Sequence, residues 1–284
     1  MTAATVAVLL AQGTAALAGA AGAQGATAGL EAELLLAHVL AAPRARLKSH
    51  PETAVAATAA QRYRELIRRR AGGEPLAYLT GRREFWSLEL AVTPAVLIPR
   101  PETELLVERA LILGKERAAR VADLGTGSGA IALALARERP DWRIVATDVS
   151  PPALAVARAN AAALGVTSIE FLAGNWFEPL AAARFELIVS NPPYVAADDP
   201  ALADTGLAFE PPLALTPAAG DALAALRLLA RGAGAHLEPG GWLLLEHGAS
   251  QGPEVRAELV AAGFAHVRSH QDLAGHERMT EGQR

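Results

Sequence analysis

The sequence predicts an α/β protein in which a doubly wound, mostly parallel sheet follows a small N-terminal helical domain. Short apolar runs with strand character lie near residues 120–124, 143–147, 168–172, 185–190 and 241–246. Helical segments separate these runs, and this alternation is typical of a parallel sheet covered by helices. The first eighty residues show helical rather than strand spacing. A chain of 284 residues, 51% of them apolar, is long enough for both parts.

Helices are expected over residues 1–80, which we interpret as one helical domain. The first helix is expected in the apolar N-terminal run, and the next covers Leu30–Leu40. A further helix covers about Ala54–Arg70 and ends before Gly72 and Gly73, since glycine is typical of a helix end. The apolar residues near one face of the first helix are Val6, Leu9, Leu10 and Leu17.

A β-hairpin is expected to link the two domains over residues 81–100. Apolar and polar residues alternate between Glu84 and Val92, as they do in a half-buried strand pair. Pro101 then suits the first turn of a helix. The second domain is therefore expected to cover residues 101–284.

The N-terminal apolar run does not have the pattern of a secretory signal. No Lys or Arg occurs before Arg44, whereas a signal peptide needs a positive region ahead of its apolar core. The run is also too rich in Gly and Ala for a convincing membrane span. We expect a cytoplasmic protein without membrane association.

The net charge and the absence of cysteine limit the partners and metal sites that can be expected. The net charge is −4, whereas a nucleic-acid-binding domain is expected to carry a basic surface, so no direct nucleic-acid partner is expected. The chain has no cysteine, which excludes disulfides and thiolate metal sites, and no metal site is expected. One basic cluster is interpreted as a solvated helix face or, alternatively, as a docking surface. It consists of Arg62, Arg64, Arg68, Arg69 and Arg70.

A glycine-rich turn predicts a ligand with a nucleoside part. It lies between the strand at 120–124 and a helix expected over Ala130–Arg139. Its residues are Gly125, Thr126, Gly127, Ser128 and Gly129. Glycines let a ligand lie against bare backbone. The spacing fits G-x-G-x-G and, with Ala130, also G-x-G-x-x-A, so the turn alone does not name the cofactor. No G-x-x-x-x-G-K-[ST] loop is present for a kinase or ATPase.

Asp148 is the candidate ribose-binding acid. It ends the strand at 143–147 and lies nineteen residues after Gly129, close to the roughly 20 expected for such an acid. Asp148 could alternatively cap the helix that begins near Pro151 and Pro152, and the two roles are compatible.

The tetrapeptide Asn191-Pro192-Pro193-Tyr194 directly follows an apolar run and suits a pocket for a planar NH2 group. The Asn191 side-chain oxygen and the Pro192 carbonyl could each accept one N–H bond, which would favour a pyramidal nitrogen with a localised lone pair. The two prolines stiffen the loop, and the Tyr194 ring could cover the flat face of the group. A simple strand-ending turn is the alternative interpretation. In a parallel sheet Gly125, Asp148 and Asn191 would meet at the carboxyl ends of the strands.

Several segments resemble the protein-(glutamine-N5) methyltransferases of the PrmC or HemK family, which are class I S-adenosylmethionine-dependent methyltransferases. The segments are Leu79–Leu88, Leu97–Glu104, Asp123–Ile131, Val189–Tyr194 and Gly240–Gly248. They occur in the order of the family, and the resemblance as a whole spans about residues 30 to 280. Asn-Pro-Pro-Tyr alone would also fit adenine-specific DNA methyltransferases, whereas the first two segments would not.

The resemblance implies a Rossmann-like fold and methylation of the glutamine in the Gly-Gly-Gln motif of class I peptide chain release factors, which modulates translation termination. It also implies that residues 1–80 recognise the protein substrate. In the implied site, Gly125 to Gly129 hold the methionine part of S-adenosylmethionine, and Asn191 to Tyr194 hold the glutamine. Trp176 lies along the adenine. Asn175 replaces an acid that is usual in the family, which predicts weaker cofactor binding.

Three functions remain open from the sequence. The first is glutamine methylation of a release factor, with a ribosomal protein as the alternative substrate. The second is methylation of an exocyclic amine on DNA or RNA, which would require a flipped base and a basic surface. The third is a cofactor-binding module without chemistry or a nucleotide-dependent oxidoreductase, which leaves Asn-Pro-Pro-Tyr unexplained.

Overall fold

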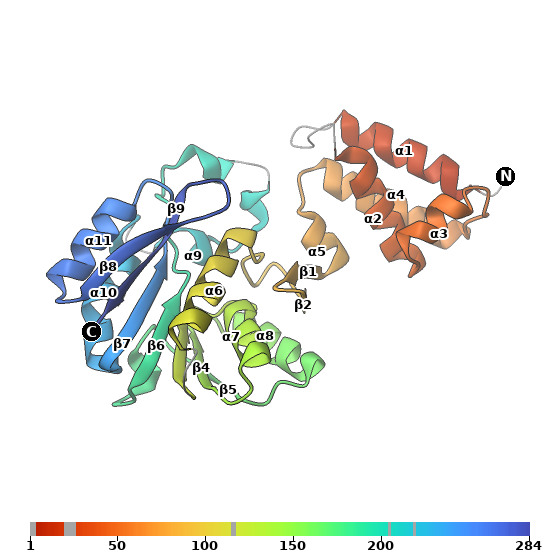
Figure 1. Ribbon diagram of the computed structural model, residues 1–284. Helices are drawn as coiled ribbons and strands as arrows, with labels where there is room; N and C mark the ends of the chain where they lie inside the picture. The colour runs from red at the N-terminus through yellow and green to blue at the C-terminus, as the bar shows by residue number, and fades with distance from the viewer. Residues whose placement is uncertain (1–3, 20–26, 115–117, 204–205, 218–219) are drawn as a thin grey trace. The chain divides into compact units, whose positions relative to one another are not determined.

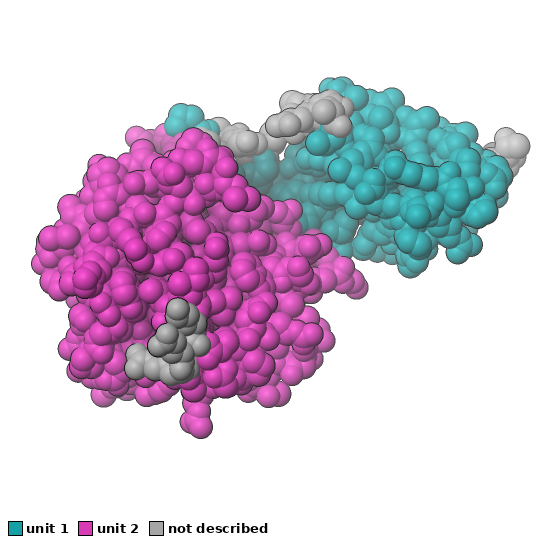
Figure 2. Space-filling model, viewed as in Figure 1, with its two compact units in different colours: residues 1–81, 200–209 teal, residues 82–199, 210–284 magenta. Residues whose placement is uncertain are grey.

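The chain folds into two compact units (Figure 2). The computed structural model describes residues 4–19, 27–114, 118–203, 206–217 and 220–284. Residues 1–81 and 200–209 form the helical unit, and residues 82–199 and 210–284 form the sheet-containing unit. Residues 200–209 thus group with the helical unit, although the sequence placed them within the domain at 101–284.

The helical unit is built from five α-helices in its described residues. They are α1 (Val6–Ala18), α2 (Ala28–Leu40), α3 (Arg44–Ser49), α4 (Ala57–Ala71) and α5 (Leu76–Thr80). Of the apolar residues expected on one face of α1, Val6, Leu9 and Leu17 are buried and Leu10 is half-buried. Gly13 lies against Tyr63 of α4, where a Cβ atom would meet the tyrosine oxygen at 1.9 Å, so the close approach of α1 and α4 requires glycine. Two short 3-10 turns, η3 (Pro200–Ala203) and η4 (Leu207–Phe209), group with this unit. None of the described helices is long and apolar enough to cross a membrane.

The second unit contains a seven-stranded sheet with the strand order β5-β4-β3-β6-β7-β9-β8. Its strands are β3 (Arg120–Leu124), β4 (Arg143–Asp148), β5 (Ile169–Ala173), β6 (Phe185–Ser190), β7 (Leu237–Glu246), β8 (Ala265–Gln271) and β9 (Glu277–Gln283). The first five strands in this order are parallel, and β9 runs antiparallel to both of its neighbours. The predicted doubly wound, mostly parallel sheet is confirmed. After β3 the chain adds β4 and β5 on one side and then β6 and β7 on the other, so the switch point where ligands bind in such sheets lies between β3 and β6.

Helices cover both faces of the sheet (Figure 1). Helices α6 (Glu104–Leu113), α7 (Ala130–Glu138) and α8 (Pro151–Leu164) lie on one face, where Val121 and Leu244 belong to their apolar core. Helices α10 (Ala224–His236) and α11 (Gly252–Ala261) cover the other face, where Ala122 and Leu243 lie in a second core. Successive strand residues therefore alternate between the two cores, as the pleat of a strand requires. The remaining short elements are η1 (Pro101–Thr103), η2 (Glu178–Leu180) and α9 (Pro212–Leu215).

An antiparallel hairpin precedes the sheet. It consists of β1 (Arg82–Phe85) and β2 (Leu88–Ala91), joined by Trp86 and Ser87. The Trp86 backbone N–H donates to Glu104 Oε1 at 2.9 Å, and its indole Nε1 donates to Glu138 Oε1 at 2.8 Å. Asn160 of α8 is buried and makes two hydrogen bonds to the backbone of Ala91, at 2.7 and 3.0 Å. These contacts attach the hairpin to the sheet-containing unit.

Candidate active site

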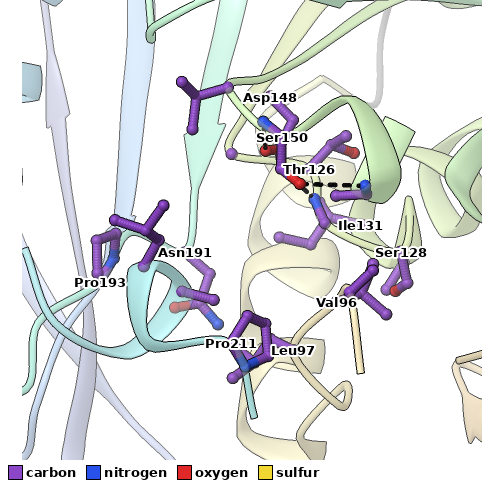
Figure 3. Close-up of a pocket in the computed structure, with 18 of the residues that line it drawn as sticks. Val96, Leu97, Thr126, Ser128, Ile131, Asp148, Ser150, Asn191, Pro193 and Pro211 are labelled. Atoms are coloured by element: carbon purple, nitrogen blue, oxygen red, sulfur yellow. Dashed lines mark hydrogen bonds between the residues drawn. The ribbon is translucent and has the colours of Figure 1, made fainter. Parts of the chain in front are cut away.

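A cavity of about 250 Å³ lies at the carboxyl ends of the central strands. In the register between β3 and β6, Asp123 pairs with Val189, so Gly125 and Asn191 leave adjacent strands at the same level. Asp148, the last residue of β4, also lines the cavity. Figure 3 shows Thr126, Asp148 and Ser150 together on one side, with Asn191 and Pro193 on another. The sheet topology thus brings three separate sequence motifs to one cavity.

The glycine-rich turn exposes backbone to this cavity. Gly125, Gly127 and Gly129 all have φ angles in the left-handed region, at 75°, 55° and 84°. A Cβ atom on Gly127 would meet nothing within 4 Å, so open space lies beside its backbone. Four residues of the predicted turn line the cavity, and they are Gly125, Thr126, Gly127 and Ser128. Gly129 does not line it, because it packs against Leu133 and Ala157 where α7 begins.

Asp148 binds the glycine-rich turn directly. The Gly127 N–H donates to Asp148 Oδ2 at 2.8 Å, and the Ser150 N–H donates to Oδ1 at 2.8 Å. Burial raises the pKa of the Asp148 carboxyl, and these backbone bonds oppose that rise. The alternative role of Asp148 as the cap of the following helix is wrong, because Ser150 is the N-cap and its hydroxyl accepts from the Ala153 N–H. The Asp148 side chain therefore remains at the cavity, while Ser150 caps the helix.

A second carboxyl group, that of the fully buried Asp123, holds the glycine-rich turn from within the protein. The Thr126 hydroxyl donates to Asp123 Oδ2 at 2.6 Å, and the Ala132 N–H donates to the same oxygen at 3.3 Å. Burial raises the pKa of Asp123 to about 7. Asp123 does not line the cavity, so it acts on the turn through Thr126.

Trp176 and Asn175 form the cavity wall next to the turn. The ring of Trp176 lies beside Gly125, where an added Cβ atom would approach it to 3.2 Å. Trp176 has a φ of 50°, which is uncommon for a residue with a side chain. The buried Thr147 hydroxyl donates to the Trp176 carbonyl at 3.1 Å and holds this backbone conformation. The tryptophan is half-buried and packs against the core under α10.

Asn191 is oriented by a residue from a distant segment. Its side-chain Nδ2 donates to Thr103 Oγ1 at 3.1 Å, and Thr103 is buried in η1. Asn191 Oδ1 accepts a hydrogen bond from no described residue. An amide that uses its nitrogen within the protein has its oxygen available to accept an N–H from a ligand.

Of the other three residues of the tetrapeptide, one lines the cavity and two do not. Pro193 lines the cavity, whereas Pro192 is buried and neither Pro192 nor Tyr194 lines it. The Tyr194 hydroxyl donates instead to Glu246 Oε1 at 3.1 Å. Burial raises the pKa of the Tyr194 hydroxyl above its ordinary value and raises the pKa of Glu246 to about 7. The structure thus brings eight of the predicted site residues to the cavity. They are Gly125, Thr126, Gly127, Ser128, Asp148, Trp176, Asn191 and Pro193.

A loop that sequence reasoning missed closes the remaining side. Residues 211–214 line the cavity next to Val96 and Leu97. Glu210, 4% exposed, forms an ion pair with Arg100 and accepts from the Ile98 N–H at 3.0 Å. This pairing joins two segments more than a hundred residues apart. The sequence gives no local signal for it, although Arg100 lies within a segment that carried the family resemblance.

Comparisons with known proteins identify the family of this chain. The chain matches the family model "PrmC N-terminal domain" over residues 9–81 and "Methyltransferase small domain" over residues 101–205. It is 53% identical to the release factor glutamine methyltransferase of Xylella fastidiosa (strain Temecula1), with 89% of this chain and 92% of the relative covered. The Escherichia coli (strain K12) release factor glutamine methyltransferase is 46% identical, with 89% and 91% covered. The chain belongs to the release factor glutamine methyltransferase family.

Solved structures agree on the fold of this release factor glutamine methyltransferase family member. A methyltransferase from Pyrococcus furiosus superposes with a TM-score of 0.52 at 18% identity, covering 69% of this chain and 88% of the other. The resemblance found in the sequence is confirmed, and the chain is an S-adenosylmethionine-dependent methyltransferase. The open space beside Gly127 and the carboxylate of Asp148 fit the methionine and ribose parts of such a cofactor. Within the described residues, no group of three or more acidic or histidine side chains could hold a metal ion.

Proposed function

We propose that this chain transfers a methyl group from S-adenosylmethionine to the side-chain amide nitrogen, N5, of a protein glutamine. The proposed substrate is the Gly-Gly-Gln glutamine of class I peptide chain release factors, whose methylation modulates translation termination. Family membership supports the reaction class. The observation that carries the proposal is the orientation of Asn191, whose Nδ2 donates to Thr103 at 3.1 Å and whose oxygen is left for a substrate N–H.

The cofactor is proposed to lie along the glycine-rich turn. Gly125, Thr126, Gly127 and Ser128 would receive its methionine part, Asp148 its ribose and Trp176 its adenine. Gly129 contributes by its left-handed φ rather than by contact, since it does not line the cavity. When bound, S-adenosylmethionine supplies a methyl group on a positively charged sulfonium.

The protein must make a poor nucleophile reactive, because an amide nitrogen shares its lone pair with the carbonyl group. Asn191 Oδ1 and the Pro192 carbonyl are proposed to accept the two N–H bonds of the glutamine side chain. Two acceptors placed in this way favour a pyramidal nitrogen whose lone pair is localised, and they stabilise it most in the transition state. Pro193 and Tyr194 stiffen and support the pocket. Positioning therefore provides most of the rate enhancement.

No general base is needed for the first step. The methylated amide cation is strongly acidic, so water can take its proton after the new N–C bond has formed. A cytoplasmic location and the absence of direct nucleic-acid binding remain part of this proposal.

The proposal is tested by incubating the chain with labelled S-adenosylmethionine and three separate acceptors. These are a class I release factor, a ribosomal protein fraction and DNA. The expected result is label on the release factor alone, with mass spectrometry placing one methyl group on its Gly-Gly-Gln glutamine. Label on a ribosomal protein alone would replace the substrate and keep the reaction, whereas label on a nucleobase would overturn both.

A further inference from the structure

The last residue of strand β7 places a carboxyl group behind the proposed glutamine pocket. In the register between β6 and β7, Ser190 pairs with Leu245, so Asn191 and Glu246 are the next residues on adjacent strands. Glu246 is 2% exposed and does not line the cavity. A buried carboxyl group is costly unless polar partners surround it, so the partners of Glu246 indicate its role.

Those partners belong to the pocket. Tyr194 Oη donates to Glu246 Oε1 at 3.1 Å. The Thr103 hydroxyl also approaches the carboxyl group closely enough to lower its pKa, although Oε2 has no partner of ordinary hydrogen-bond geometry among the described residues. Thr103 Oγ1 is in turn the acceptor for Asn191 Nδ2. One carboxyl group therefore acts on both ends of the Asn191 to Tyr194 segment.

The Asn191 amide is oriented by Thr103. Because Thr103 Oγ1 accepts from Asn191 Nδ2 at 3.1 Å, the oxygen end of the amide is left for the substrate. The Glu246 carboxyl group is close to the same threonine hydroxyl group.

The segment after β7 holds Tyr194 a second time. Gln251 Nε2 donates to the Tyr194 carbonyl at 3.0 Å, and Gln251 Oε1 accepts from the Gly248 N–H at 2.8 Å. The tyrosine is thus fixed at both its hydroxyl and its backbone by residues 246–251.

We propose that Glu246 is a positioning residue for methyl transfer, which holds Tyr194 directly and supports Thr103, the acceptor of the Asn191 amide. This inference rests on the proposed function and names a determinant of it outside the tetrapeptide. Its role is to present a hydrogen-bond acceptor rather than a negative charge. Loss of Glu246 therefore lowers kcat, while cofactor affinity stays unchanged because Glu246 does not line the cavity.

The test compares Glu246→Leu with Glu246→Gln. Leucine removes the acceptor and should lower kcat about tenfold to a hundredfold, which is the scale for residues that hold the groups in contact with a ligand. Glutamine keeps an acceptor oxygen for Tyr194 and should retain kcat to within about threefold. The dissociation constant for S-adenosylmethionine, measured by calorimetry, should stay within about threefold for both. Equal loss in both variants would overturn the acceptor role.

Thr103→Val and Thr280→Val form a matched pair of variants that does not require the buried glutamate to be replaced. Both remove a buried hydroxyl group, but the Thr280 hydroxyl bonds to His247 and Ser269, neither of which lines the cavity. Thr103→Val should lower kcat as Glu246→Leu does, and the double variant should lose little more than either single one, because the two act in series. Thr280→Val should lower the melting temperature and leave kcat unchanged.

Failure of this inference and failure of the proposed function give different results. If the unmodified enzyme methylates no glutamine, the proposed function is wrong. If it does so and Thr103→Val or Glu246→Leu turns over normally when folded, only the positioning role is wrong. Should Glu246→Leu fail to fold, the Thr103→Val and Thr280→Val comparison decides by itself, and equal kcat values would overturn the role.

Discussion

The Gly127 N–H lies 2.8 Å from Asp148 Oδ2, so the acid proposed to hold the ribose also holds the glycine-rich turn. Asp148 ends β4, and Gly127 follows the adjacent strand β3. Loss of the carboxylate would therefore remove a ligand contact and release the turn at the same time.

Asp148→Ala should weaken S-adenosylmethionine binding by about 1–3 kcal/mol, the scale for losing hydrogen bonds to a charged group. Asp148→Asn retains one acceptor oxygen for the Gly127 N–H and should lose less. Asp141→Ala, at an exposed carboxylate paired with Arg139, serves as the control. Calorimetry measures all three, and a protein that binds NAD but not S-adenosylmethionine would contradict the assignment.

Asn191→Ala should act mainly on kcat. It removes an acceptor whose bond strengthens as the substrate nitrogen becomes pyramidal, so the loss should be about 10²–10³-fold, as for other preorganised transition-state bonds. Cofactor affinity should change far less. Steady-state kinetics on a release factor provides the measurement, and a release factor carrying asparagine in place of the glutamine should react poorly. Near-normal turnover of Asn191→Ala would rule out the amide pocket.

Asn175→Asp should tighten cofactor binding by about 1 kcal/mol, since a hydrogen bond to a charged acceptor is stronger than one to a neutral amide. Asn175 lines the cavity beside Trp176, and the resemblance found in the sequence implies an acid at this position. Asn175→Ala is the matched control and should bind more weakly than the unmodified chain. Equal affinity of the aspartate and alanine variants would show that this side chain does not contact the cofactor.

Removing residues 1–81 should leave S-adenosylmethionine affinity largely intact, because every described residue of the cavity lies in the other unit. Methylation of an intact release factor should fall far more than methylation of a short Gly-Gly-Gln peptide if the helical unit recognises the protein substrate. Parallel assays on both substrates make the comparison. An equal loss on both would mean that the helical unit supports folding alone.

The free energy of unfolding should fall as pH rises from about 4.5 to about 7. Burial raises the pKa of Glu246 from 4.5 to about 7, and that of Asp123 from 3.8 to about 7. The folded state then binds more protons than the unfolded state, so this stabilisation is present below the unfolded pKa and lost through pH 7. The pKa of Glu281 is lowered to about 2, so its contribution is lost only in stronger acid.

The Glu246→Gln variant isolates one of these titrations. Relative to the unmodified chain, it should gain at least about 1 kcal/mol on going from pH 5 to pH 8, since one pKa unit corresponds to about 1.4 kcal/mol. Urea unfolding at the two pH values measures this difference. A difference that does not change with pH would contradict the raised pKa.

The sequence predicted the parallel strands well because they are apolar runs, but it missed β9. This strand carries Thr280 and Glu281, both fully buried, and therefore lacks the usual apolar pattern. Glu281 pairs with Arg109, which is distant in the sequence, and with Arg268 of the adjacent strand β8, at 3.0 and 2.6 Å. A polar strand that is buried through long-range ion pairs cannot be found from local hydropathy.

Site residues that belong to a local motif could be predicted from the sequence. Contacts between residues of distant segments could not. The glycine-rich turn, Asp148 and Asn191 each follow a strand, so topology alone brings them together. Thr103 and Glu246 lie within segments that the resemblance included, but only the structure joins them to Asn191. The docking interpretation of the arginine cluster also weakens. Arg68 pairs with Glu65, Arg69 with Glu74 and Arg70 with Glu31, which leaves only part of its charge unmatched.

Asn160 determines where a chimera between related enzymes can be joined. Its side chain bonds both polar groups of Ala91 at the end of the hairpin and also the Ser128 carbonyl of the glycine-rich turn, at 2.9 Å. A graft that exchanged the hairpin together with the helical unit, with its junction near residue 100, would take Ala91 and Asn160 from different parents, although the bond from Asn160 to Ser128 would stay within one parent. A junction between Gly81 and Arg82 keeps the hairpin, α8 and the turn from one parent. The part of the chain that should come from one parent in such a chimera therefore begins with the hairpin rather than with the first strand of the sheet.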